Sequence, residues 1–195
     1  EAGIPIFIDK PLTDNEPDLV EFVRYYREGR PILSCSGFRF AREIEELDLG
    51  AVGTPLLVDC MINKSWEKYG IHLLEGLQRI MGSGVERVQN LGDVKTNVVH
   101  LRYADGRQAV VNVVYPAQIT KYDIVGTNSS LSTRVGDSFY MFKKQLQVFV
   151  EFARTRRQPF PPEETFELIK IVIAGIRSRE EGGRVVRLEE IGPPV

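Results

Sequence analysis

The spacing of hydrophobic and polar positions along the chain changes near residue 40. Before that point, a short apolar run at 4–8 is followed by a helix-like pattern over 13–29 and a second apolar run at 31–38. Continuous apolar runs of this length are typical of strands buried on both faces of a parallel sheet. A strand, a helix and a strand predict one crossover unit. One such unit cannot cover both faces of a parallel sheet. Residues 1–40 are therefore expected to be the C-terminal end of a doubly wound domain.

The helix-like segment carries its own start and stop signals. Asp14 or Asn15 can cap its N-terminus, Pro17 falls in its first turn, and Gly29 can end it. The apolar positions recur with a helical period, so one face of the helix is expected to be buried. That predicted stripe consists of Leu19, Val20, Phe22, Val23 and Tyr26.

After residue 40 the strands become longer and alternate apolar with polar positions. A short charged helix at 41–47 precedes them, one helix at 70–82 interrupts them, and two long helices at 137–154 and 158–183 follow. Asp105-Gly106 lies between two alternating runs and is a strong hairpin signal. The predicted strands cover 54–62, 84–93, 95–103, 107–116 and 120–127.

These patterns predict an α+β fold. We expect a mostly antiparallel, open-faced sheet with helices on one face, formed by residues 41–195 and preceded by the β-α-β remnant of a Rossmann domain at 1–40.

The two faces of the predicted hairpin differ in composition. One face is apolar and should be covered by the helices; it consists of Val99, Leu101, Tyr103, Val111, Val113 and Tyr115. The other is richer in valine than a solvent-facing surface needs, which predicts a homo-oligomer through the sheet face. That second face consists of Thr96, Val98, His100, Arg102, Gln108, Val110, Asn112 and Val114.

Composition and charge narrow the classes of partner. The chain has 195 residues and a formal net charge of -2, which does not favour binding to nucleic acid or to a membrane surface. Cys35 and Cys60 each lie in an apolar, strand-like run, so we interpret both as reduced core thiols, with a disulfide as the alternative. No signal peptide and no apolar run near 18 residues is present, so a soluble, cytoplasmic protein is expected.

Metal chemistry has no support in the spacing of the residues. The two histidines and two cysteines are widely separated, so no metal site is expected. His100 lies within an alternating strand and is interpreted as a residue of the sheet face rather than a catalytic group.

Lys10 is the first candidate for chemistry. It follows an apolar strand directly, and open α/β sheets bind ligands beyond the carboxyl ends of their strands. Pro11 then fixes the backbone of the turn. An ammonium held there could polarise a hydroxyl or take part in proton transfer. The alternative is a solvated lysine at a strand end.

His72 is the second candidate, in the first turn of the helix predicted at 70–82. A histidine with a carboxylate one helical turn later could be an oriented general base, while the alternative is a capping or surface histidine. Helical spacing places it on one face with Glu75, Gly76 and Arg79, and we interpret this face as a polar stripe. The opposite face, expected in the core, consists of Ile71, Leu74, Leu77 and Met81.

Several segments resemble one family. IFIDKPLT at 6–13 resembles the E-K-P strand end of the glucose–fructose oxidoreductase and inositol dehydrogenase (Gfo/Idh/MocA) family, with Asp9 where Glu is usual. GIHLLEGL at 70–77 resembles its G-x-H-x-x-D helix, with Glu75 in place of Asp. Weaker similarities, in the same order as in the family, are SGFRFAREIEEL at 36–47, IVGTNSSL at 124–131 and IRSREEGGRVVRL at 176–188.

The resemblance implies roles for particular residues. Lys10 would contact substrate and nicotinamide and His72 would take the hydroxyl proton, so these two are the expected catalytic residues. The cofactor-binding residues would be Asp9, Lys10 and Pro11, and the substrate-binding residues Glu75, Lys68 and Arg39.

The resemblance also implies an activity. The chain is expected to be the C-terminal part of an oxidoreductase that uses NAD or NADP to oxidise a sugar, a polyol or a related secondary alcohol. The dinucleotide domain with its G-x-G-x-x-G loop would precede Ile4. This fragment alone would therefore bind no cofactor and be inactive.

One departure from the family supports an alternative. Many members carry an acidic residue four positions before the histidine, and Lys68 occupies that position here, with Glu67 one residue away. The alternative is a catalytically silent member that serves as a binding or oligomerisation module.

Overall fold

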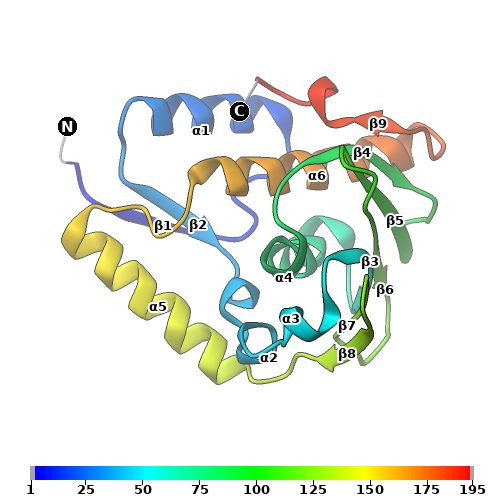
Figure 1. The fold of residues 1–195 in the computed structure, drawn as a ribbon. Helices are drawn as coiled ribbons and strands as arrows, with labels where there is room; N and C mark the ends of the chain where they lie inside the picture. The colour runs from blue at the N-terminus through cyan, green and yellow to red at the C-terminus, as the bar shows by residue number, and fades with distance from the viewer. Residues whose placement is uncertain (1–2, 194–195) are drawn as a thin grey trace.

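The computed structural model describes residues 3–193. It contains a two-stranded parallel sheet, β1 (Ile6–Asp9) and β2 (Ile32–Cys35), and a seven-stranded sheet with the order β8-β7-β3-β6-β5-β4-β9. Figure 1 shows the small sheet at one end of the molecule and the large sheet at the other, with α6 (Pro162–Glu180) between them. The predicted α+β class is confirmed. The boundary at residue 40 stays a prediction.

The β1-α1-β2 unit forms as predicted, because its helix has strong end signals. In α1 (Glu16–Arg27) the Asn15 side chain accepts a hydrogen bond of 3.0 Å from the backbone N–H of Asp18, and Gly29 follows the helix with a φ of 75°. Leu19 and Val23 are buried, whereas Val20 is exposed, so that part of the predicted stripe was wrong.

The prediction that β1 is buried on both faces is also wrong. Ile4 is 65% exposed and Ile6 is 51% exposed. β1 has one strand neighbour, β2, among the described residues. Because no second layer of the described chain covers the outer part of this strand, its apolar side chains remain accessible.

The large sheet is antiparallel except where β3 runs parallel to β6, which fits the predicted mostly antiparallel arrangement. The Asp105-Gly106 turn joins β5 and β6, and Gly106 has a φ of 93°. The strands are β3 (Pro55–Ile62), β4 (Val85–Asn90), β5 (Thr96–Tyr103), β6 (Gln108–Val114), β7 (Lys121–Gly126), β8 (Ser130–Arg134) and β9 (Val186–Arg187).

One face of this sheet is covered by helices. Within the core, α4 (Ile71–Met81) packs against β3 and α6 packs against β4, as Figure 1 shows. Trp66 is fully buried and donates a hydrogen bond of 2.9 Å from Nε1 to the carbonyl of Val172 in α6. Gly70 and Gly175 allow this packing, because a Cβ at either would lie 2.6 Å from the Trp66 ring. The shorter helices are η1 (Gly37–Phe40), α2 (Arg42–Glu45), α3 (Leu49–Val52), the π-helix η2 (Trp66–Gly70) and η3 (Leu188–Glu190).

The two predicted faces of the β5–β6 hairpin are largely as expected. Val99, Leu101 and Val111 belong to the apolar face and are completely buried. Tyr115 does not belong to it, because it follows β6 and is 61% exposed. Asn112 lies on the open face but is buried, since its Nδ2 donates to Asp59 Oδ2 at 3.1 Å.

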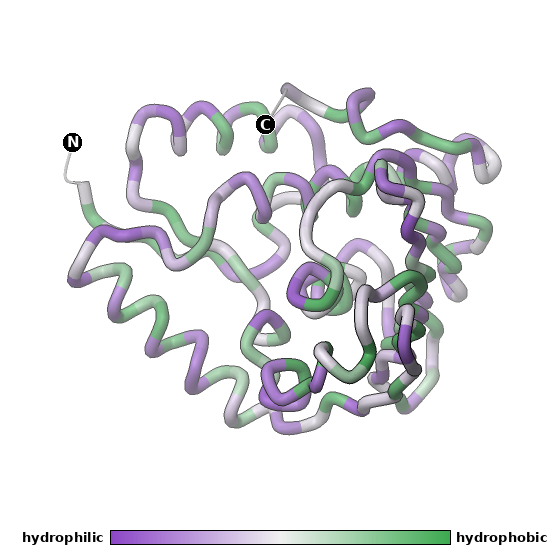
Figure 2. The backbone as a smooth tube through the Cα atoms, in the orientation of Figure 1, coloured by the Kyte–Doolittle hydropathy of each residue, from purple (hydrophilic) through white to green (hydrophobic). Residues whose placement is uncertain are grey.

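Helix α5 (Ser138–Thr155) leaves four large apolar residues exposed. Its buried side packs on η1 through Met141 and Gln145, and Gln145 Nε2 donates to the carbonyl of Cys35 at 2.7 Å. Figure 2 shows hydrophobic and hydrophilic segments alternating along it. The exposed apolar residues are Phe139, Phe142, Leu146 and Val150.

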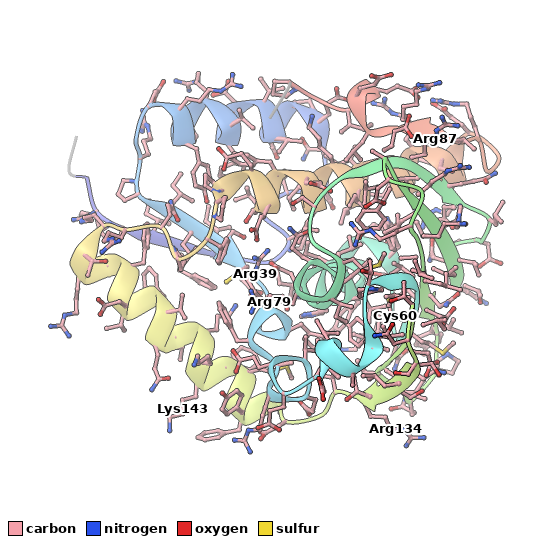
Figure 3. All side chains as sticks on the ribbon, viewed as in Figure 1. Arg39, Cys60, Arg79, Arg87, Arg134 and Lys143 are labelled. Carbon is pink, nitrogen blue, oxygen red and sulfur yellow. The ribbon has the colours of Figure 1, made fainter. Side chains whose placement is uncertain are left out.

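Both cysteines are buried and free, as predicted. Figure 3 shows Cys60 within the sheet region of the molecule. Over the described part of the chain, none of the helices combines the length and the apolar character that a membrane span requires.

Candidate functional site

His72 forms the centre of the candidate site. It lies in the first turn of α4, directly after η2, and its ring is partly exposed. Five other segments supply the residues around it: the end of β1 with Lys10, the end of β2 with Ser36, η1 with Phe38, the turn after β3 with Lys64, and η2 with Tyr69. The site therefore joins the small parallel sheet to the helical layer of the large sheet.

Ser36 contacts the imidazole of His72 from the protein interior. Its Oγ lies 2.6 Å from His72 Nδ1 and also accepts a hydrogen bond of 3.1 Å from the backbone N–H of Phe38. Ser36 is completely buried, so this contact is shielded from water. Because Nδ1 is engaged in this bond, Nε2 is the ring nitrogen available to a substrate.

Two aromatic rings flank the imidazole. The ring centroids of Phe38 and His72 are 4.8 Å apart, and those of Tyr69 and His72 are 5.0 Å apart. These contacts and the bond to Ser36 restrict the orientation of the ring, which proton transfer requires.

The structure places Lys10 beside the same tyrosine. Lys10 Nζ lies 5.0 Å from the Tyr69 ring centroid and donates a hydrogen bond of 3.2 Å to the backbone carbonyl of Lys68. The following peptide bond, Lys10-Pro11, is cis. Lys10 and His72 therefore both adjoin Tyr69, although they come from different elements.

Lys64 is a second ammonium at this ring. Its Nζ lies 4.2 Å from the Tyr69 ring centroid and donates to the Tyr69 hydroxyl. Its backbone has a φ of 82°, which non-glycine residues rarely adopt, and its N–H is held by Asn63 Oδ1 at 2.6 Å. Strained backbone of this kind is concentrated at functional sites.

The surroundings lower the pKa of His72 to about 3. Burial is the main cause, and the positive charges of Lys10 and Lys64 add to it. The imidazole is therefore neutral at physiological pH and has a free lone pair with which to accept a proton.

The sequence pattern placed Glu75 on a polar stripe opposite the core face of α4, but Glu75 is itself buried in the core. Only 1% of Glu75 is exposed, because α4 is packed between η1, α6 and the sheet. Its Oε1 accepts a hydrogen bond of 2.9 Å from the backbone N–H of Ser36, and its Oε2 accepts one from Arg39 Nε. Burial raises the pKa of the Glu75 carboxyl, and Arg39 and the Ser36 N–H oppose that shift.

The expected substrate contacts of Glu75 and Arg39 need the same correction. Arg39 is 3% exposed, lies over the Phe160 ring at 4.0 Å and donates to Glu164 Oε2 at 2.5 Å. Figure 3 shows Arg39 in the interior, close to the end of β2. Neither side chain presents a surface to a ligand here. Their observed contacts instead fix the backbone of Ser36, which in turn bonds to His72.

Neither Glu67 nor Lys68 supplies the acidic group that the family resemblance implies next to His72. Glu67 turns away and pairs with Arg179 at 2.5 Å. Lys68 is exposed, and its backbone carbonyl rather than its side chain contacts the site, through Lys10.

The structure also locates the other residues that were singled out from the sequence. Asp9 ends β1 and is exposed, next to Lys10 and Pro11. His100 lies on the open face of the large sheet, and its Nε2 is 2.8 Å from Gln108 Oε1.

Sequence reasoning missed Ser36, Lys64 and Tyr69. Ser36 follows a strand and caps η1, a pattern that the sequence could have indicated. Lys64 and Tyr69 carry no such signal, because their relevance depends on how η2 packs beside β1.

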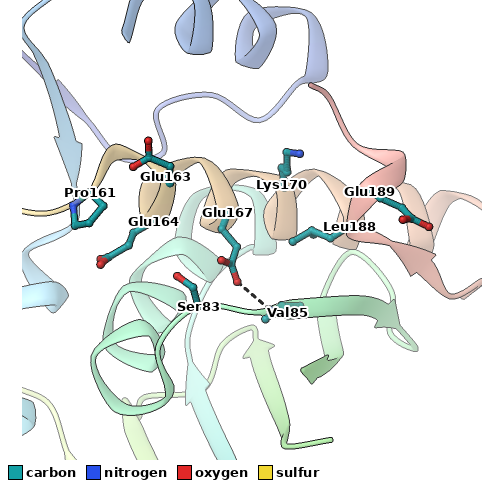
Figure 4. A pocket seen from close by; sticks show the side chains of 9 residues that line it. All are labelled: Ser83, Val85, Pro161, Glu163, Glu164, Glu167, Lys170, Leu188 and Glu189. Atoms are coloured by element: carbon teal, nitrogen blue, oxygen red, sulfur yellow. Dashed lines mark hydrogen bonds between the residues drawn. The ribbon is translucent and has the colours of Figure 1, made fainter. Parts of the chain in front are cut away.

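A cavity of about 520 Å³ lies between α6, β4 and η3 and is shown in Figure 4. Two of its charged groups, Glu167 and Lys170, already have structural partners. Glu167 Oε1 accepts from the N–H groups of Gly84 and Val85 at 2.8 and 2.9 Å, and Lys170 Nζ donates to the carbonyl of Pro193 at 2.7 Å. No cluster of potential metal ligands occurs within residues 3–193. We therefore assign the cavity no chemistry.

No protein-family model and no curated protein sequence matches the chain. Solved structures do match it. A probable dehydrogenase from Thermotoga maritima is 19% identical with a TM-score of 0.84, and the match covers 97% of this chain and 75% of that one. For a myo-inositol dehydrogenase from Corynebacterium glutamicum the values are 15%, 0.77, 99% and 74%. For GenD2 from gentamicin A biosynthesis, in complex with NAD, they are 15%, 0.79, 95% and 72%. This chain shares its fold with these three proteins over almost its entire length.

Proposed function

We propose that the chain is the C-terminal part of a Gfo/Idh/MocA-type oxidoreductase that uses NAD or NADP to oxidise a sugar, a polyol or a related secondary alcohol. One observation carries the proposal. Lys10, at the carboxyl end of a parallel strand, and His72, at the start of α4, adjoin one tyrosine ring. The shared fold with dehydrogenases supports the same class of reaction.

In this proposal the residues divide the work of alcohol oxidation. The C–H bond of the carbinol carbon breaks with its electron pair, the O–H proton leaves, and a carbonyl forms. When bound, the nicotinamide supplies the hydride acceptor. Nε2 of His72 takes the hydroxyl proton. For this, the neutral ring must carry its own proton on Nδ1, and this N–H donates a hydrogen bond to Ser36 Oγ. Lys10 donates a hydrogen bond to the substrate oxygen and stabilises the negative charge that develops on it.

The described residues fit only one end of a dinucleotide. Lys10 at the end of β1 can meet the nicotinamide ring, with Asp9 and Pro11 shaping the turn. The connection from β1 to α1 contains no glycine, so it forms no cradle for a pyrophosphate. In the proposal, a preceding Rossmann portion of the same enzyme holds the rest of the cofactor.

Turnover by the full-length protein tests the proposal, with NAD and NADP against a panel of polyols and sugars. Lys10→Ala and His72→Ala are each expected to lower the rate about a hundredfold to ten-thousandfold, because each removes a positioned group. His100→Ala is the control, since His100 lies on the open sheet face. Unchanged turnover in either variant would remove that residue from the mechanism.

The alternative function is that of a catalytically silent binding or oligomerisation module. The specific observation in its favour is that no acid pairs with His72 within residues 3–193: Lys68 occupies the sequence position four before it, and Glu67 is held by Arg179. Undetectable turnover across the panel, restored in part by Lys68→Asp, would favour this alternative.

A further inference from the structure

We propose that the site around Tyr69 binds a substrate that carries an anionic group, either a carboxylate or a phosphate, close to the hydroxyl that is oxidised. This proposal adds a substrate class to the proposed function. The assignment of the anion to the substrate rests on that function. The binding of an anion can be measured without any turnover.

The first observation is the convergence of two ammonium groups. Lys10 and Lys64 come from different parts of the fold, yet both Nζ atoms lie within 5.0 Å of the Tyr69 ring centroid. Within residues 3–193 both ammonium groups donate to neutral oxygens, Lys10 to the Lys68 carbonyl and Lys64 to the Tyr69 hydroxyl. Two like charges at one ring repel each other, and an anion between them would relieve that repulsion.

The second observation is the lack of a balancing carboxylate. Within residues 3–193, the one lysine paired with an acid is Lys121, on the open sheet face. Glu67 and Glu75, the acids nearest in sequence to Tyr69 and His72, are committed to Arg179 and Arg39. Asp9 precedes Lys10 directly in the chain, but no ion pair joins the two within residues 3–193. The site therefore carries net positive charge next to a neutral imidazole. Such a site favours an anionic ligand over a neutral polyol.

The third observation is the backbone of Lys64. A lysine in the left-handed region is strained, and glycine or asparagine would occupy this turn at lower cost. The strain directs the side chain back onto Tyr69, where its ammonium meets the hydroxyl. A surface lysine without a role would not need this conformation.

The anion would also assist the proposed chemistry. Lys10 and Lys64 help to hold the pKa of His72 at about 3, which makes the imidazole a weak base. An anion that neutralises the lysines raises this pKa toward its ordinary value. The base would then become stronger when the correct substrate is bound.

Two sources could supply the anion, the substrate or a phosphate of the dinucleotide. Both lysines lie at the tyrosine whose ring contacts His72, the group expected to contact the reacting hydroxyl. This favours the substrate. D-Glucuronate and D-glucose 6-phosphate carry the two candidate anions at the position where D-glucose has a hydroxyl, and ADP represents the cofactor phosphate.

The experiment titrates the chain with each of these four compounds and with inorganic phosphate. Binding is followed by calorimetry and by the NMR signals of the His72 ring. The anionic compounds are expected to bind at least about tenfold more tightly than D-glucose and to raise the pKa of His72. In Lys64→Asn this preference should fall by roughly tenfold to a hundredfold, as expected for a hydrogen bond to a charged group. Asparagine tolerates the left-handed backbone, so the turn should stay folded.

Lys95→Asn is the matched control, because it removes an exposed turn lysine by the same substitution. Anions that leave the His72 signals unmoved, or bind no better than D-glucose, would overturn the inference, as would equal losses in Lys64→Asn and Lys95→Asn. Binding confined to ADP would assign the anion to the cofactor and overturn the substrate assignment. Anion binding by this chain without turnover by the full-length protein would refute the proposed oxidation alone. Turnover of neutral polyols that is unaffected by Lys64→Asn would refute the anion site alone.

Discussion

Ser36 and His72, which are 36 positions apart in the sequence, are joined by a contact of 2.6 Å between Oγ and Nδ1. The serine is completely buried and the imidazole is partly exposed. The contact therefore links the interior at the end of β2 to the outward-facing nitrogen of the candidate base.

Ser36→Ala should separate this orienting role from a capping role. The variant loses the cap of η1, which costs about 1 kcal/mol of stability, and also the bond that fixes the His72 ring. We expect turnover of the full-length enzyme to fall about tenfold or more, with a changed pH profile. Asn15→Ala is the control, since it removes the cap of α1, away from His72. Equal effects of the two variants on turnover would contradict the orienting role.

Glu75→Gln should destabilise the protein strongly. It leaves the buried Arg39 without the charge of its closest partner, and breaking a buried ion pair typically costs about 3–5 kcal/mol. Glu21→Gln is the matched control, because the Glu21–Arg24 pair is exposed, and such pairs contribute about 0–1 kcal/mol. Urea denaturation measures both free energies of unfolding. Similar losses in the two variants would show that Glu75 does not stabilise the core.

The low pKa of His72 predicts an acid-sensitive fold. An unfolded histidine takes up a proton below about pH 6.5, whereas His72 in the folded chain stays neutral down to about pH 3. The unfolded state therefore binds more protons in this window, and stability falls as the pH decreases through it. The groups facing His72 are Ser36, Phe38, Tyr69, Lys10 and Lys64.

Denaturation of the wild type and of His72→Gln at pH 7 and pH 4.5 checks this dependence. The wild type should lose more stability than the variant between the two values. The His72 NMR signal, distinguished from that of His100 by a His100→Gln variant, should show a neutral ring at pH 5. A ring that is protonated at pH 5 would refute the prediction.

The open face of the large sheet is predicted to pair with a second copy of the chain. Val110 lies at its centre, opposite His100 on β5 and Asp59 on β3. Val110→Glu should convert a dimer or larger assembly to a monomer, because it places a charge in an apolar contact. Light scattering at tens of micromolar measures the mass. Leu91→Glu, at an exposed turn, is the control. A wild-type monomer, or an assembly that tolerates Val110→Glu, would contradict the prediction.

This chain alone is predicted to bind NAD and NADP only weakly. The turn from β1 to the N-terminus of α1 lacks the glycine-rich loop that holds a pyrophosphate. Calorimetric titration of the chain with each dinucleotide should show no affinity in the micromolar range. Micromolar binding of either one would sink the prediction.

Much of the fold followed from local patterns. Caps and glycines predicted the ends of α1, and the Asp105-Gly106 turn predicted the β5–β6 hairpin. Alternation along these two strands predicted which hairpin residues are buried, with Tyr115 and Asn112 as exceptions. These signals are reliable because each depends on residues close together in the chain.

Burial was harder to predict where it depends on what covers an element. Helical spacing placed Glu75 on one face of α4 with His72, but it could not show that η1 and α6 cover that face. The apolar residues of β1 and of α5 indicated a strand and a helix, and yet many of them are exposed. A periodic pattern shows which residues share a face, not which faces meet.

The sequence by itself determined most of the elements and their order, the two core thiols and the candidates Lys10 and His72, but it did not predict β8 or β9. Only the tertiary structure brought Lys10, Lys64 and His72 to one tyrosine ring and gave His72 its buried partner, Ser36. The physical reason is range. Helix and turn signals act over a few residues, whereas the charge around an imidazole depends on side chains that long-range packing brings within a few ångströms of it.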